Sequence, residues 1–230
     1  MDTGASPGRQ GPPSPPSSTV GVVVVARDPG DWFEEVLAGL ASQDYRNLWV
    51  LVVDTGHLPV ADRVAAILPD ARVVAARPTM TFGAAANLVL EDLGDPSVGG
   101  FYLFLRDDLV LAGTGVRRML EAALEVNAGI VGPKVLDGED PTCLDDMGAT
   151  VDRLGSPVAR VDPGEADQGQ HDGRLEVFAS SEAAVMVRAD LFAALGGFDV
   201  GIRSPDSHVD LCWRARLAGA SALLVPNAVG

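Results

Sequence analysis

Two adjacent acids, Asp107 and Asp108, follow the apolar run Phe101–Leu105, and Arg106 stands between them and that run. In an α/β protein, the carboxyl end of a buried strand opens onto the ligand crevice. Carboxylates at such a place suit a divalent cation that carries the phosphates of a substrate. The alternative interpretation of the same residues is a charged turn that closes a strand.

Two further acids hold similar places in the sequence. Asp28 closely follows the run Val20–Ala26, and Asp54 directly follows the run Leu48–Val53. Because the carboxyl ends of parallel strands meet at one edge of a sheet, we expect these acids to gather there with Asp107. Each of them alone is also a common helix cap or turn former. Their shared position in the pattern favours a binding site.

The segments around these acids alternate between strand-like runs and stretches of helical periodicity. Strands are expected at residues 20–26, 48–53, 71–76, 101–105, 129–135, 177–188 and 221–225, and helices at 32–41, 60–68, 83–93, 115–126, 190–195 and 209–218. Asp31 is expected to cap the first helix. The alternation predicts an α/β fold with a mainly parallel, doubly wound sheet and helices on both faces.

Residues 136–175 interrupt the alternation. They are rich in Gly, Asp and Pro, and they include a polar run at 167–172 that contains His171. A loop of this length inside a compact domain is usually functional or disordered. His171 is therefore a candidate to contact an acceptor or a phosphate, although a surface histidine is the commoner case.

The composition bounds the domain organisation. A chain of 230 residues with 47% hydrophobic content can bury one substantial core. We therefore expect a single domain over residues 19–230. Residues 1–18 are rich in Pro, Gly and Ser and are expected to form a disordered tail.

The charge excludes one class of partner. Seventeen Lys and Arg residues against 32 Asp and Glu give a net charge of −15, which repels nucleic acid and leaves no basic stripe for it. A phosphorylated small molecule would need a cation or backbone N–H donors to offset this repulsion.

Cysteine usage and hydropathy indicate the compartment. Cys143 and Cys212 lack the spacing of a zinc site or a disulfide scaffold, which favours a reducing compartment. No apolar window reaches the roughly eighteen residues of a membrane span, and the first residues do not resemble a signal peptide. We expect a soluble, cytoplasmic chain.

From about residue 20 onward, the chain resembles the family 2 glycosyltransferases of GT-A fold. The resemblance is carried by the opening strand, helix and strand, by a helix start containing Gly and Asn, by the acids after the fourth strand, and by later blocks. These segments are residues 20–56, GAAAN at 83–87, Arg106-Asp107-Asp108, AGIVGPKVLD at 128–137, MGATVDRLGSP at 147–157, GGFD at 196–199 and VDLCWRARLAG at 209–219.

The resemblance implies a donor, a cofactor and an acceptor. The donor is a nucleoside-diphosphate sugar, the cofactor is a divalent cation, Mn²⁺ or Mg²⁺, and the acceptor is a glycan or a lipid-linked sugar. The acid that ends the second strand contacts the nucleobase in this family. Donor binding is thereby assigned to Ala26, Asp28, Asp54, Asn87 and Asp107, and metal binding to Asp108.

The sequence departs from the family pattern at three places. Ser207 and His208 stand where members carry an acidic pair whose second acid is the catalytic base, Arg106 replaces the first acid of the DxD motif, and Glu182 replaces a small Gly. His208 has a suitable pKa range for a base, or is simply a loop residue. Asp206 is the substitute candidate for the base.

Trp213 is a candidate wall of the acceptor pocket, and packing against the sheet is the alternative. The run 163–173 further resembles long actinobacterial members in which this domain precedes many membrane spans. It implies a place at the cytoplasmic face of the membrane, a role in the cell envelope, and further segments beyond Gly230.

Two other functions are alternatives to glycosyl transfer. A degenerate glycosyltransferase-like domain that binds or scaffolds within a larger membrane protein is favoured by Ser207-His208 and Arg106. A dinucleotide-binding oxidoreductase is disfavoured, because the turn at residues 26–31 lacks the G-x-G-x-x-G pattern.

Overall fold

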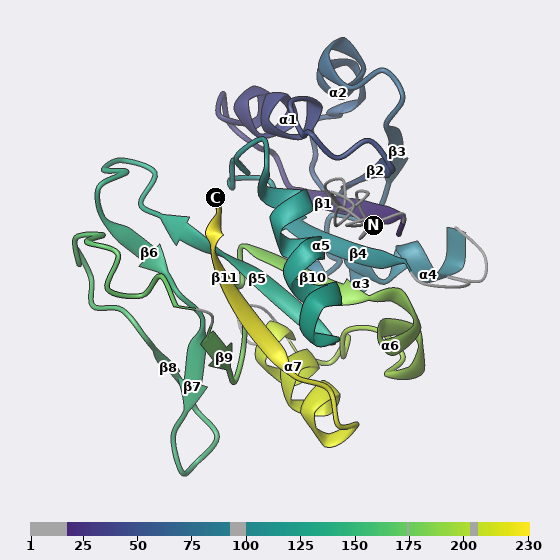
Figure 1. Cartoon of the computed structure of the whole chain (residues 1–230). Coiled ribbons are helices and arrows are strands. Elements are labelled where there is room, and N and C mark those ends of the chain that lie inside the picture. The colour runs from purple at the N-terminus through teal and green to yellow at the C-terminus, as the bar shows by residue number, and fades with distance from the viewer. Residues whose placement is uncertain (1–17, 93–99, 174, 203–206) are drawn as a thin grey trace, which may run out of the picture.

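The computed structural model describes residues 18–92, 100–173, 175–202 and 207–230. The tail expected at 1–18 therefore lies almost wholly outside the described residues. Nine strands of the described part form one sheet (Figure 1). They are β1 (Val20–Ala26), β2 (Leu48–Asp54), β3 (Arg72–Ala75), β4 (Phe101–Arg106), β5 (Ile130–Leu136), β6 (Leu144–Asp146), β9 (Leu175–Val177), β10 (Ala184–Arg188) and β11 (Ala222–Val229).

Seven helices and a separate hairpin complete the described chain. The helices are α1 (Phe33–Ala41), α2 (Ala61–Ile67), α3 (Phe82–Ala86), α4 (Leu88–Asp92), α5 (Gly115–Val126), α6 (Ala189–Ala194) and α7 (Ser207–Leu217). The hairpin pairs β7 (Ala149–Val151) with β8 (Pro157–Ala159) in antiparallel fashion.

The main sheet has the strand order β3-β2-β1-β4-β10-β5-β11-β9, and β6 pairs with β5. Strands β1 to β4 run parallel to one another, as do β5 and β11. Strand β10 is inserted antiparallel between β4 and β5, and β9 lies antiparallel on β11. The mainly parallel α/β sheet predicted from the sequence is confirmed.

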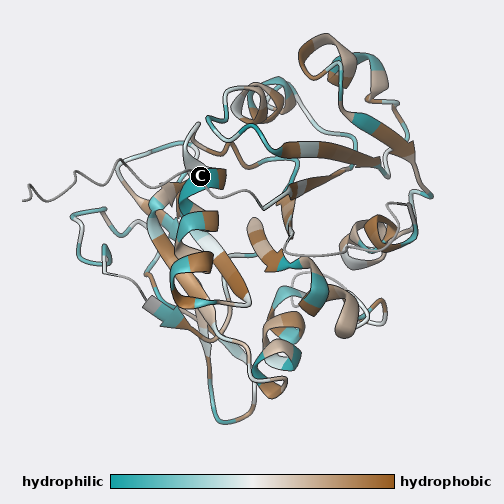
Figure 2. Cartoon of the chain, turned by 45° about the vertical axis from the view of Figure 1, so that its right-hand side comes forward, coloured by the Kyte–Doolittle hydropathy of each residue, from teal (hydrophilic) through white to brown (hydrophobic). Residues whose placement is uncertain are grey.

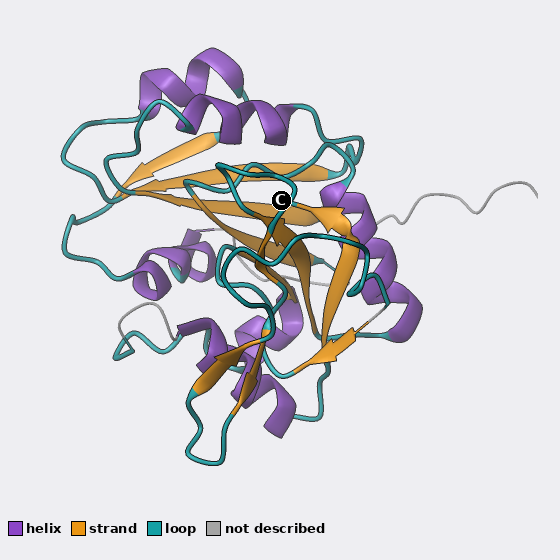
Figure 3. Cartoon of the chain, turned by 90° about the vertical axis from the view of Figure 1, so that its left-hand side faces the viewer, coloured by secondary structure: helices purple, strands orange, loops and turns teal. Residues whose placement is uncertain are grey.

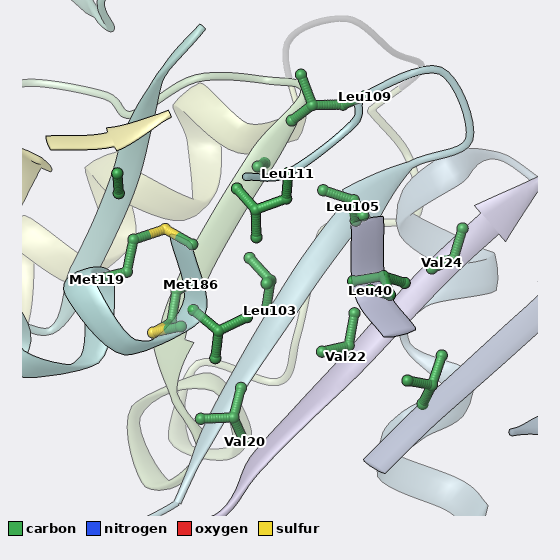
Figure 4. Close-up of a cluster of buried hydrophobic side chains, with 14 of the residues drawn as sticks. Val20, Val22, Val24, Leu40, Leu103, Leu105, Leu109, Leu111, Met119 and Met186 are labelled. Atoms are coloured by element: carbon green, nitrogen blue, oxygen red, sulfur yellow. The ribbon is translucent and has the colours of Figure 1, made fainter. Parts of the chain in front are cut away.

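Helices cover both faces of this sheet, as Figure 3 shows. On one face, α1, α2 and α5 pack on residues such as Val22, Leu103 and Met186 (Figure 4). On the other face, α3, α4, α6 and α7 pack on alternate residues such as Val23 and Phe104. Because both faces are covered, β1 is buried along its whole length, which explains its continuous hydrophobic run in the sequence (Figure 2).

The boundaries differ from expectation at three places. The helix expected at 83–93 is divided at Asn87 into α3 and α4. The strand expected at 177–188 is divided into β9 and β10, because Ala179 between them bridges to Ala149 of the hairpin. Asp31 does not cap α1, which begins after Trp32 without a side-chain cap.

Candidate functional site

A cleft of about 850 Å³ opens at the carboxyl ends of β1 and β4. These strands pair in parallel with Val25 opposite Arg106, so the residues that follow both strands come to the same edge. The cleft is lined by Val25, Arg27, Thr79, Met80, Thr81, Phe82, Arg106, Asp107, Glu182 and Val200. Sequence reasoning thus placed Asp107 and the strand ends correctly at one edge.

Asp107 is joined to the end of β1 by a hydrogen bond. The backbone N–H of Arg27 donates to its Oδ2 over 2.7 Å. Burial raises the pKa of the Asp107 carboxyl, and the Arg27 N–H acts in the opposite direction. The carboxylate therefore lies in a partly desolvated place where a cation would stabilise its charged form.

The Arg27 side chain connects three segments at the cleft. Its Nη2 donates to the carbonyl oxygen of Met80, and its Nε lies 3.4 Å from Oγ1 of Thr55. The guanidinium thereby links the ends of β1 and β2 to the segment that follows β3. Its role in the described structure is to position that segment.

Arg106 stands at the boundary between this cleft and a second cavity of about 520 Å³. Its Nη2 donates to Oδ2 of Asp108 over 2.5 Å, and its backbone N–H donates to the carbonyl oxygen of Ala183 over 3.0 Å. Asp108 lines the second cavity together with Asp145. Burial raises the pKa of Asp145, and neighbouring acids, including Asp108, add to that effect.

Asp54 and Ala26 are the last residues of β2 and β1. Asp54 is 7% exposed, and its carboxylate accepts hydrogen bonds from the backbone N–H groups of Gly56 and Val60 at 2.9 and 3.1 Å. The carbonyl oxygen of Ala26 accepts the Thr55 N–H over 2.8 Å. Asp54 thus organises the turn after β2, and its contact with a nucleobase stays a prediction.

Asp28 connects the loops that follow β1 and β2. Its Oδ1 accepts from the N–H groups of His57 and Leu58 at 2.6 and 2.9 Å, and its Oδ2 lies 3.0 Å from Nδ1 of His57. The His57 side chain, followed by the Leu58 and His57 N–H groups, lowers the pKa of Asp28 to about 2. The residue has φ of +46°, a conformation that aspartate tolerates better than most residues.

Asn87 has both of its amide groups engaged by one residue. Its Nδ2 donates to the carbonyl oxygen of Phe198, and its Oδ1 accepts the Phe198 N–H, each over 2.8 Å. This reciprocal pair fastens the α3 to α4 junction to the Gly196–Asp199 block. The described contacts are structural, and the predicted role of Asn87 in donor binding stays a prediction.

His208, Trp213 and His171 are not among the described residues that line the cleft. His208 is half-buried in the first turn of α7. Trp213 is 42% exposed on the same helix and packs edge-on against Phe178. His171 Nε2 lies 2.9 Å from Oε1 of Glu165 in the 136–175 segment. Asp206 lies outside the described residues.

The donor set of the cleft suits a hard cation that is shared with a ligand. Asp107 contributes carboxylate oxygen, which Mg²⁺ and Mn²⁺ prefer, and Mg²⁺ is commonly held by one or two carboxylates plus substrate phosphates. Within the described residues, no three His, Cys, Asp or Glu side chains converge as a complete metal site. The chain thus fits a cation completed by diphosphate and water.

Sequence reasoning missed Arg27 as part of a binding site, and it named Arg106 and Glu182 only as departures from the family pattern. Arg27 and Arg106 each lie at the end of a predicted parallel strand, so their convergence was open to prediction from the same pattern as the acids. Glu182 reaches the cleft only because β10 is inserted beside β4, with Ala184 opposite Leu105. That pairing has no local signal in the sequence.

Known proteins match this chain in sequence and in fold. The chain is 25% identical, over 90% of its length and 73% of the relative's, to the N-acetylglucosaminyl-diphospho-decaprenol L-rhamnosyltransferase of Mycobacterium tuberculosis, in strains CDC 1551 / Oshkosh and ATCC 25618 / H37Rv. No family model matches the sequence.

Two crystal structures of TarS from S. aureus share the fold. TarS 1–349 superposes with a TM-score of 0.62 at 14% identity, covering 92% of this chain and 59% of that one. A longer TarS chain superposes with a TM-score of 0.63 at 15% identity, covering 92% of this chain and 36% of the TarS chain. The chain thus spans less than two thirds of either TarS chain. In sequence the chain is similar to these rhamnosyltransferases, and its fold is the GT-A fold of glycosyltransferases such as TarS.

Proposed function

We propose that this chain is a glycosyltransferase domain that transfers a sugar from a nucleoside-diphosphate sugar to a glycan or a lipid-linked acceptor. The observation that carries the proposal is the 850 Å³ cleft at the carboxyl ends of β1 and β4, lined by Asp107 and two arginines. Its place in the sheet is where nucleotides bind in open α/β folds. The relatives with rhamnosyltransferase names support the class of reaction.

We further propose that Asp107 and Asp108 hold a divalent cation with the donor diphosphate. Asp107 faces the cleft, whereas Asp108 becomes available when its ion pair with Arg106 opens. The cation would neutralise the diphosphate as it leaves. Asp28, Asp54 and Ala26 are proposed to form the edge on which the nucleoside lies.

We propose that the acceptor lies at α7, with His208 or Asp206 accepting the proton of the acceptor hydroxyl. Trp213 and His171 are the proposed further contacts of the acceptor. We further propose that the domain works at the cytoplasmic face of a membrane in cell-envelope synthesis, as the sequence resemblance implies; the relatives' name contains a decaprenol-linked sugar, which is consistent with a lipid-linked acceptor. Within the described residues, no helix has the length and apolar character needed to cross a bilayer.

The first prediction concerns nucleotide binding and its metal dependence. Isothermal titration with UDP, GDP and dTDP should show one nucleotide that binds more tightly in Mn²⁺ than in EDTA. Asp107→Asn should weaken binding in Mn²⁺ by about tenfold or more, because a charged metal ligand is lost, and Asp108→Asn should weaken it as well.

Glu139→Gln is the matched control, because this exposed acid lies outside the lining of both cavities. Equal affinity in Mn²⁺ and EDTA would contradict the metal assignment, and absence of binding by any nucleotide would contradict the proposed function. Binding without turnover of any donor would indicate the degenerate binding module instead.

A further inference from the structure

Among the described residues that line the cleft, the formal charges balance one another, although the whole chain has a net charge of −15. Arg27 and Arg106 contribute two positive charges, and Asp107 and Glu182 contribute two negative ones. The excess of negative charge elsewhere on the molecule repels a diphosphate. At this one edge, the two arginines offset that repulsion locally.

The two arginines differ in what their guanidinium groups already do. Arg27 uses Nη2 and Nε to hold Met80 and Thr55, so its donors serve the wall of the cleft. Arg106 donates through Nη2 to Asp108, and a guanidinium has five N–H donors in a planar fork. Arg106 is therefore the cleft arginine with more donor capacity for a ligand.

The backbone of Arg106 is held rigidly at this position. It is the last residue of β4, which lies between β1 and β10, and it is opposite Val25 in the first of these strands. Its N–H donates to Ala183 over 3.0 Å. Because the backbone is already fixed, only the side chain of Arg106 has to be ordered when an anion binds.

The side chain of Arg106 lines both the cleft and the second cavity and is 43% exposed. A guanidinium stays charged at any physiological pH, so this group is a permanent cation, and it is partly shielded from water. Such a guanidinium suits two-point binding of phosphate oxygens.

We propose that Arg106 binds the diphosphate of the nucleotide directly, as a built-in cation at the end of β4. The proposal rests on the nucleotide-binding function above and adds a binding residue to it. A guanidinium in contact with the diphosphate neutralises part of its negative charge without a metal ion. Part of the affinity for diphosphate therefore persists without metal.

The test is isothermal titration of the folded chain in EDTA with inorganic pyrophosphate, with the nucleoside diphosphate that binds in Mn²⁺, and with the corresponding nucleoside. Arg106→Gln should weaken pyrophosphate and nucleotide binding by about tenfold or more and leave nucleoside binding unchanged, because hydrogen bonds between charged groups are lost. Arg106→Lys, which keeps the charge but not the fork, should be intermediate. Arg106→Asp should bind the nucleotide in Mn²⁺ but lose the binding that the wild type shows in EDTA.

Arg117→Gln is the control for net charge, since this arginine of α5 pairs with Asp44 and Glu121 and does not line the cleft. It should leave all three affinities unchanged, and circular dichroism of each variant should show the wild-type fold. Failure of the wild-type chain to bind pyrophosphate or nucleotide in EDTA overturns the inference, as does equal binding by Arg106→Gln.

These outcomes separate the inference from the proposed function. Nucleotide binding in Mn²⁺ with no effect of Arg106→Gln in EDTA overturns the role of Arg106 and leaves the function standing. Pyrophosphate binding that depends on Arg106, without binding of any nucleotide, supports the anion site and overturns the nucleotide-sugar function.

Discussion

His208 lies in the first turn of α7 and is half-buried there, and the family resemblance of the sequence implies a carboxylate base at this place. An imidazole titrates near neutral pH and is able to accept a proton from a hydroxyl. When Nε2 is the accepting nitrogen, however, it is farther from the backbone than the oxygen of an aspartate. A base that is displaced from its ideal position loses much of its advantage, because proton transfer requires hydrogen-bond contact.

The residue-scale prediction follows from that displacement. The chain should transfer sugar slowly, and His208→Ala should lower kcat by about 10²-fold or more if the histidine is the base. Asp206→Asn should have that effect instead if the aspartate takes the role. Nucleotide affinity, measured by titration, should be unchanged in both variants, since neither side chain is proposed to hold the donor. Turnover at ordinary enzyme rates, unaffected by both substitutions, would contradict this account.

At the scale of elements, Asp28 joins the loop after β1 to the loop after β2. Its carboxylate accepts two backbone N–H groups and contacts the His57 ring, and its pKa falls to about 2. Because the folded-state pKa lies below the unfolded value of 3.8, the charged form stabilises the fold above about pH 4. This contribution is lost as the pH falls toward 2.

The expected outcome is a stability difference that depends on pH. Asp28→Gly keeps the positive φ but removes the carboxylate, so its urea midpoint should lie below that of the wild type at pH 6. The gap should narrow as the pH is lowered from 4 to 2. Asp31→Gly, the same substitution in the same loop, should show a gap that changes less with pH. A gap for Asp28→Gly that is constant from pH 6 to 2 would show that the carboxylate contributes nothing.

At the scale of the whole molecule, Lys134 fastens the long 136–175 segment to the sheet. It lies on β5, is 5% exposed, and its Nζ contacts Asp167 and Asp172 at 2.8 and 2.7 Å. Burial disfavours its charge, but these two carboxylates outweigh that effect and raise its pKa. The described residues of the segment, 136–173 and 175, therefore form short strands and turns that are attached to the core.

Lys134→Met should reduce the free energy of unfolding by roughly 1–3 kcal/mol, because two carboxylates lose their buried partner. Limited proteolysis should then cut within residues 160–173 faster than in the wild type. Adding Asp167→Asn and Asp172→Asn to the methionine variant should restore part of the loss, since the uncompensated charges are removed. Identical stability and cleavage rates in Lys134→Met and wild type would rule out the fastening role.

Much of the fold follows from local patterns in the sequence. The β-branched run at β1, the periodicity of α5 and the acids after β4 are short-range features, and they correctly predicted a doubly wound sheet with Asp107 at its edge. These features succeed because a strand buried on both faces must be apolar throughout, and because parallel strands end at one edge.

Tertiary structure alone decided which side chains meet. Glu182 lies beside Arg106 because β10 inserts antiparallel next to β4, a pairing between segments about eighty residues apart that no local pattern encodes. Likewise, Asn87 binds Phe198 and Asp28 binds the His57 loop because packing brings distant turns together. The sequence by itself determined the sheet and its functional edge, whereas long-range packing determined how the charges at that edge are partnered.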